Sequence, residues 1–121
     1  MSEPVRLAAF ARARSGDKGD LANVALFAPN PVLYDALRRE VTAERVRAHF
    51  GSFVRGPVDR YEVPNLLALN FVLHAALDGG AARSLRSDPL GKSFGSLLLR
   101  LPVTLRDDER AALPAAASPP Q

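Results

Sequence analysis

The sequence predicts an α+β sandwich, in which a mainly antiparallel sheet carries helices on one face. Alternating apolar and polar residues, typical of strands, occur near both ends of the chain, and helical spacing of apolar residues occurs between them. A chain of 121 residues, 47% of them hydrophobic, is long enough for one core and too short for two. Hairpins at both ends with helices between them favour an antiparallel sheet that is covered on one side.

The first hairpin is expected in residues 5–28. Residues 5–14 alternate as a strand does, with small apolar side chains on one face. Residues 15–20 read Ser-Gly-Asp-Lys-Gly-Asp, which is the composition of a turn, although longer than the common hairpin loops. Residues 23–28 are expected to form the second strand, which the prolines at 29 and 31 end.

Two helices are expected next, over residues 31–39 and from Thr42 to about residue 53. Thr42 is suited to cap the second helix, and Val41 and Val46 are spaced as a hydrophobic staple. One apolar stripe of this helix comprises Val46, His49, Phe50 and Phe53.

Residues 58–63 are expected to form a third strand. Asn65 would then cap a helix over residues 66–77, which is apolar on nearly every side except for a line through Asn70, His74 and Asp78. Residues 82–87 and 94–103 alternate like two final strands. The chain is charged and then rich in alanine and proline after residue 105. We therefore expect one domain over residues 1–105 and a disordered or loosely packed tail over residues 106–121.

Composition excludes several classes of protein. The absence of cysteine excludes disulfide scaffolds, thiolate zinc sites and cysteine nucleophiles, and two histidines are too few for a histidine metal cage. Sixteen basic and 13 acidic residues are interspersed, so no nucleic-acid partner is expected. No signal peptide or membrane-spanning stretch is visible, which predicts a cytoplasmic protein without a membrane partner.

The first candidate site is the segment 15–20. Gly16 and Gly19 permit close backbone approach, and Lys18 suits a phosphate or carboxylate. Asp17 and Asp20 would orient backbone amides or bind a cation. The alternative is a purely structural turn closed by aspartate–backbone hydrogen bonds. The residues proposed to bind a ligand or a partner here are Ser15, Gly16, Asp17, Lys18, Gly19 and Asp20.

A second group comprises Asn23, Arg60, Tyr61 and Asn70. An arginine such as Arg60 can hold a carboxylate or phosphate with two hydrogen bonds, and Tyr61 can stack or donate one. The alternative is an arginine that pairs with an aspartate of the sheet, and a half-buried tyrosine. Asn70 is a poor helix former and should therefore bond something specific, either within the chain or in a partner. His74 is a conceivable general base or a satisfied interior residue. We assign no catalytic residue, metal or cofactor.

Four blocks of the sequence, in this order along the chain, carry a resemblance to a known family. They are residues 14–20 (RSGDKGD) with 23–26 (NVAL), 60–65 (RYEVPN), 68–73 (ALNFVL), and 79–80 (GG) with 84–88 (SLRSD) and 91–92 (GK). They resemble the ferredoxin-fold domain at the C-terminus of acyclic terpene utilisation protein A (AtuA). The resemblance covers roughly residues 5–101 and carries little over residues 36–53 and the tail.

This resemblance implies a ferredoxin-like two-layer sandwich in a bacterial protein. It implies an accessory subunit or domain of an AtuA-type protein in the catabolism of acyclic terpenoids or branched acyl-CoA compounds. Because the chain begins at the first strand, we expect the stand-alone form, whose partner is the larger AtuA-type N-terminal protein. The segment 15–20 would then lie at a shared ligand or partner site.

Two alternatives remain open, because the resemblance carries no catalytic mechanism. One is a stand-alone hydratase, isomerase or hydrolase that uses Asp17, Lys18 and His74. The other is a structural oligomerisation module. An apolar helix over residues 66–77 would favour a homo-oligomer in either case.

Overall fold

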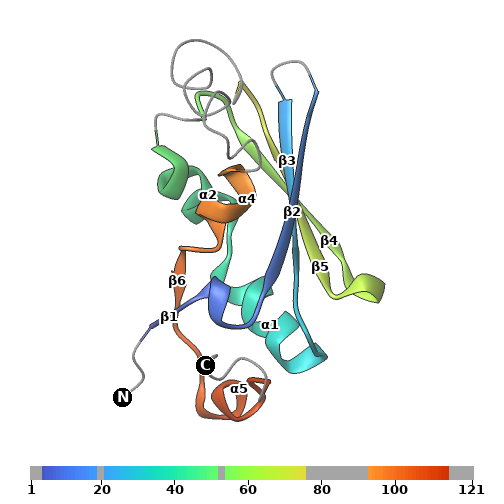
Figure 1. The fold of residues 1–121 in the computed structure, drawn as a ribbon, viewed down its shortest axis with the longest axis vertical. Helices are drawn as coiled ribbons and strands as arrows, with labels where there is room; N and C mark the ends of the chain where they lie inside the picture. Colours follow the sequence, from blue (N-terminus) through green and yellow to red (C-terminus); the bar gives the residue numbers. More distant parts are fainter. Residues whose placement is uncertain (1–3, 19–20, 52–53, 76–92, 115–121) are drawn as a thin grey trace.

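The computed structural model describes residues 4–18, 21–51, 54–75 and 93–114. These residues form a sandwich of two layers, with a sheet on one side and helices on the other (Figure 1). The predicted α+β class and the mainly antiparallel sheet are confirmed. None of the helices in these ranges is long and apolar enough to cross a membrane.

The sheet layer has four antiparallel strands in the order β2-β3-β5-β4. Two hairpins supply them, and in each hairpin one strand lies at the edge and one in the centre. The strands are β2 (Arg12–Lys18), β3 (Leu21–Phe27), β4 (Val58–Val63) and β5 (Ala68–Leu73). The strand predicted over residues 58–63 therefore has the bounds that the sequence predicts.

The helix layer consists of α1 (Pro31–Glu40), α2 (Ala43–Phe50) and α4 (Ser93–Leu98). The start of α2 confirms the predicted cap, because the Thr42 hydroxyl accepts a hydrogen bond from the amide of Arg45 at 3.1 Å. Asn30 caps α1 in the same way, through the amide of Leu33 at 2.9 Å. Side chains of both layers meet in a continuous core. Its fully buried members include Val24, Leu26, Leu33, Leu37, Val46, Leu69, Phe71 and Leu73.

The prediction of one continuous strand over residues 5–14 is wrong. The chain forms β1 (Val5–Arg6), then a 3₁₀ turn, η1 (Leu7–Ala9), before β2 begins. β1 pairs with β6 (Pro102–Val103) in a small separate sheet. Phe10 is buried inside this turn, and a single uninterrupted strand would have pointed it away from the alanine face.

The helix predicted over residues 66–77 is a strand in its described part. Pro64–Leu66 form a 3₁₀ turn, η3, and the chain enters β5 through Leu67, whose φ is 53°. Asn65 therefore caps no helix. A short apolar run is compatible with a central strand as well as with a buried helix, and the pairing of β5 with both β3 and β4 selects the strand. Asp78 lies outside the described residues.

The C-terminal part also differs from the prediction. Residues 93–98 form α4, not the start of a strand, and the predicted strand over residues 82–87 lies outside the described residues. Within the expected tail, α5 (Asp107–Ala111) is a short helix that packs against α1. Its Glu109 is 3% exposed, so this part of the tail is docked on the domain.

Candidate functional site

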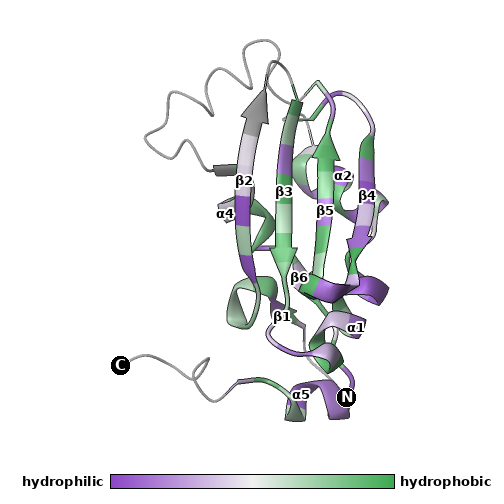
Figure 2. Cartoon of the chain, turned by 90° about the vertical axis from the view of Figure 1, so that its right-hand side faces the viewer, coloured by the Kyte–Doolittle hydropathy of each residue, from purple (hydrophilic) through white to green (hydrophobic). Residues whose placement is uncertain are grey.

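The four-stranded sheet has one face turned away from the helices, which we call the open face. Figure 2 looks directly at this face, and α1, α2 and α4 do not lie in front of the strands, whereas the 3₁₀ turn η3 borders the face at one end. Strand pairing places its side chains in three rows across β2, β3, β5 and β4. The rows are Gly16–Asn23–Val72–Asp59, Arg14–Ala25–Asn70–Tyr61 and Arg12–Phe27–Ala68–Val63.

The centre of the open face contains an amide pair. The Asn23 side chain donates from Nδ2 to Oδ1 of Asn70 across 3.1 Å. Tyr61 stands opposite Asn70 on β4 and is 53% exposed. Three candidate residues from distant parts of the sequence therefore lie together. The bond that Asn70 was predicted to need is present, although on a strand.

Gly16 belongs to the same group. It stands opposite Asn23 in the register, and a Cβ atom built on it would lie 3.2 Å from Oδ1 of Asn23. The glycine therefore provides the close approach that the sequence analysis predicted, here for a neighbouring strand.

The segment 15–20 is not the turn that its composition predicts. β2 continues to Lys18, which pairs with Leu21, so only residues 19 and 20 lie between the paired strands. Gly19 and Asp20 lie outside the described residues, as do the side chains of Asp17 and Lys18.

Ser15 is separated from the open face. It lies on the helix-covered face, where a Cβ atom built on Gly95 of α4 would stand 3.2 Å from the Ser15 hydroxyl oxygen. Adjacent residues of a strand point to opposite faces, so the Ser15 side chain does not share the open face with the Asn23–Asn70 pair.

Arg60 is also separated from the open face. Its guanidinium donates to the carbonyl oxygens of Arg38 and Val41, both at 3.1 Å, and to the Glu62 carboxylate at 2.9 Å. These bonds satisfy the C-terminal end of α1 and hold it against β4. The ion-paired alternative describes this arginine better than a ligand clamp does.

A second polar pair lies at the hairpin end of the open face. Nε2 of His74 is 2.7 Å from Oδ2 of Asp59, and the two side chains are 36% and 46% exposed. A carboxylate that fixes one imidazole nitrogen orients the other for proton transfer. Asp59 was not among the predicted site residues, because His74 was expected on a helix. The alternation of Asp59 and Tyr61 along β4 was the signal that could have found it.

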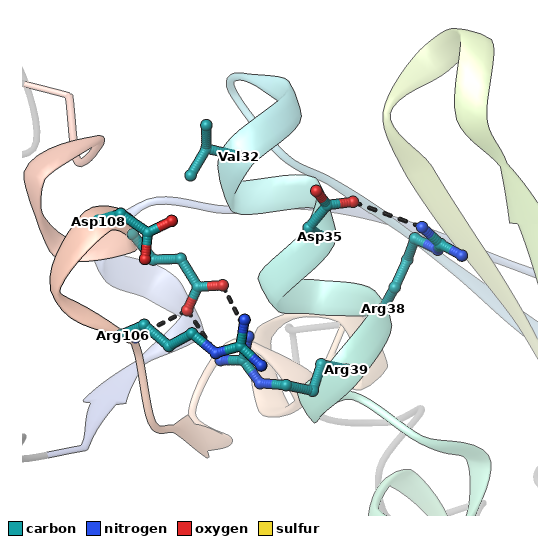
Figure 3. Close-up of a pocket in the computed structure, with 7 residues that line it drawn as sticks. Val32, Asp35, Arg38, Arg39, Arg106 and Asp108 are labelled. Carbon is teal, nitrogen blue, oxygen red and sulfur yellow. Dashed lines mark hydrogen bonds and ion pairs between the residues drawn. The ribbon is translucent and has the colours of Figure 1, made fainter.

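A hollow of about 560 Å³ between α1 and α5 has a different character (Figure 3). Nη1 and Nη2 of Arg39 donate to Oε2 and Oε1 of Glu109 at 2.7 and 2.8 Å. These hydrogen bonds lower the pKa of Glu109 and raise that of Arg39, against the opposing effect of burial. The lining contains three basic and three acidic side chains, so its charges cancel and it serves to hold α5. The six charged side chains of the lining are Arg38, Arg39, Arg106, Asp35, Asp108 and Glu109.

No group of three or more histidine, aspartate or glutamate side chains within the described ranges is placed to hold a metal ion. The chemistry available on the open face is therefore hydrogen bonding by amides and a phenol, charge from two arginines, and the imidazole–carboxylate pair.

Comparison with known proteins gives one family. The family model of the AtuA ferredoxin-like domain matches residues 5–104, which include β1 to β6 and α1, α2 and α4. No curated protein and no solved structure matches the chain. The match ends before α5.

Proposed function

Because this chain belongs to the AtuA ferredoxin-like domain family, we propose that it is an accessory subunit of a larger AtuA-type protein. We place its activity in bacterial catabolism of acyclic terpenoids or branched acyl-CoA compounds. The larger protein would dock on the open face, and the segment 15–20 would lie at one end of the contact.

The composition of the open face is the main observation that supports this proposal. An antiparallel sheet with one solvated face usually alternates cleanly between apolar and polar residues. Here the open side carries Ala25, Phe27, Val63 and Val72, all partly exposed. The exposed Tyr61 adds a residue type that is common in interfaces. Burial against a second protein would remove this apolar surface from water.

The polar groups of the face would supply specificity. The exposed Asn23–Asn70 pair has hydrogen-bonding capacity beyond its single mutual bond, since each amide has two donors and an acceptor. A partner that satisfies these groups is distinguished from one that leaves them unpaired. Gly16, Asn23, Tyr61 and Asn70 are therefore the described candidates that we assign to the contact. Lys18, two positions beyond Gly16 in β2, would extend it at the hairpin.

The proposal is tested by introducing the same charge on and off the open face. Ala25 lies between Arg14 and Asn70 on the open face, whereas Ala48 is exposed on α2. We expect Ala25→Glu to weaken binding to the larger AtuA-type protein by at least about tenfold, equivalent to ~1.4 kcal/mol. Ala48→Glu should bind like the wild type. Titration calorimetry on the purified proteins measures both affinities, and circular dichroism confirms that each variant is folded. Equal affinities for the two variants would contradict docking on this face.

The part played by the hairpin is tested in cells. Lys18→Ala should abolish growth of the host on citronellol while the subunit stays folded and abundant. Normal growth would remove the segment 15–20 from the proposal and leave the docking of the open face intact.

The His74–Asp59 pair favours one alternative, a stand-alone hydratase, isomerase or hydrolase. Turnover of a terpenoid acyl-CoA by the purified chain alone, abolished in His74→Gln, would support it. The oligomerisation module loses its main argument, because the described part of the expected apolar helix is β5. The open face is then the candidate surface for a homo-oligomer, and sedimentation of the isolated chain measures whether it associates.

A further inference from the structure

A second hollow lies at the end of the open face away from the β2–β3 hairpin. It has a volume of about 550 Å³. Its lining comprises Phe10, Arg12, Ala13, Arg14, Phe27, Ala28, Pro29 and Leu66. Arg12 stands opposite Phe27 in the register, and the amide of Ala28 donates to the carbonyl of Leu67 at 2.9 Å. That bond holds η3 beside the end of β3, so the walls of the hollow are set by backbone pairing.

Among the residues that the structure describes, no acidic side chain lines this hollow. Its two charged lining residues in these ranges are Arg12 and Arg14, both exposed and two positions apart on one face of β2. Within the described ranges, neither guanidinium makes a hydrogen bond or ion pair. Two neighbouring arginines without a carboxylate repel each other, and an anion bound between them would remove that repulsion. The hollow beside α5 differs in this respect, because its acids and bases are equal in number.

The remaining walls are apolar. Leu66 is 60% exposed, the highest value among the large hydrophobic residues of the described ranges, and Phe27 is partly exposed on the sheet beside it. An apolar surface with a few convergent polar groups is typical of small-molecule sites, whose volumes run from about 300 to 1,000 Å³. Because backbone hydrogen bonds already hold the wall segments in place, these segments need not become ordered when a ligand binds.

We propose that this hollow binds a small amphipathic carboxylate. The carboxylate accepts hydrogen bonds from Arg12 and Arg14, and the apolar body of the ligand covers Phe27 and Leu66. The hollow shares Arg12, Arg14 and Phe27 with the open face, at the end away from the hairpin. The titrations below use the isolated chain, so their outcome does not depend on the docking proposed above.

Matched probes test the ligand class. In calorimetric titrations of the purified chain, octanoate should bind saturably. Octanol lacks the charge and acetate lacks the apolar body, so each should bind at least about tenfold more weakly. Raising the salt concentration should weaken octanoate binding, because the arginines are exposed. Octanol binding as tightly as octanoate, or inorganic phosphate displacing octanoate at equal concentration, would overturn the assignment.

Variants test the residues. Arg12→Gln and Arg14→Gln should each lower octanoate affinity by about tenfold, and Leu66→Ser should do the same through the apolar contact. The control is Arg100→Gln, an exposed arginine after α4 that does not line the hollow. If a glutamine variant fails to fold, Arg14→Lys provides a milder change that keeps the charge and loses the planar fork. Wild-type affinity in folded Arg12 and Arg14 variants would refute the proposal.

Discussion

The ion pair between Arg39 and Glu109 is the described contact whose removal should have the clearest effect on stability. Glu109 is 3% exposed and accepts two hydrogen bonds from Arg39 and a third from the amide of Arg106 at 2.8 Å. The Arg39 side chain is 30% exposed. Replacing Arg39 with methionine retains the aliphatic stem and leaves the buried carboxylate with one hydrogen bond.

The expected cost lies between two limits. Breaking a fully buried pair costs about 3–5 kcal/mol, and breaking an exposed pair costs about 0–1 kcal/mol. Water can reach the vacated side of this carboxylate because Arg39 itself is partly exposed, which relieves part of the penalty. We therefore expect Arg39→Met to lower the free energy of unfolding by about 2–3 kcal/mol.

Urea unfolding followed by circular dichroism measures this difference. Arg38→Met is the matched control on the same helix. The ion pairs of Arg38 with Asp35 and Glu62 are both 3.4 Å long and exposed, so its loss should cost at most about 0.5 kcal/mol. The double variant Arg39→Met/Glu109→Leu should recover part of the loss, since an apolar pair needs no charge compensation. The remainder persists because the Arg106 amide and the Thr104 carbonyl lose their side-chain partners. A cost for Arg39→Met no larger than that of Arg38→Met would refute the reasoning.

Three further predictions concern stability. The ion pair holds the pKa of Glu109 below 4.5, so its stabilisation is present above about pH 4.5 and is lost as pH falls through the lower folded-state pKa. The urea midpoint of the wild type should therefore fall further between neutral pH and pH 3 than that of Glu109→Gln. Gly56→Ala should lower the thermal midpoint and cost about 1–3 kcal/mol, because the new Cβ would lie 2.9 Å from both Cβ and the carbonyl oxygen of His74. Phe71→Ala should cost about 3–5 kcal/mol in urea unfolding, whereas Val72→Ala on the open face should cost about 1 kcal/mol or less, and the reverse order would contradict the strand assignment.

The sequence pointed to several residues that lie together on the open face, but it did not predict how they are arranged. Asn23, Tyr61 and Asn70 were grouped for their chemistry without a common face, and strand pairing brings them to one face. Arg60 was grouped with Tyr61 for its chemistry, but adjacent residues of a strand point to opposite faces. Applying this alternation to the site as well as to the fold would have separated the two residues.

The sequence by itself determined the features that depend on a few neighbouring residues. The cap at Thr42, the helix from Pro31 and the strand over residues 58–63 each rest on contacts or alternation within one turn or one strand. Composition likewise excluded cysteine chemistry.

Only the tertiary structure decided which elements pair. Residues 68–73 are apolar enough for either a helix or a central strand, and hydrogen bonds from β3 and β4 on both sides make them a strand. Glu109 becomes a buried anchor because Arg39, 70 positions earlier, meets it. The physical reason is the same in both cases. The free energy that selects these conformations comes from partners distant along the chain, and a local pattern contains no record of them.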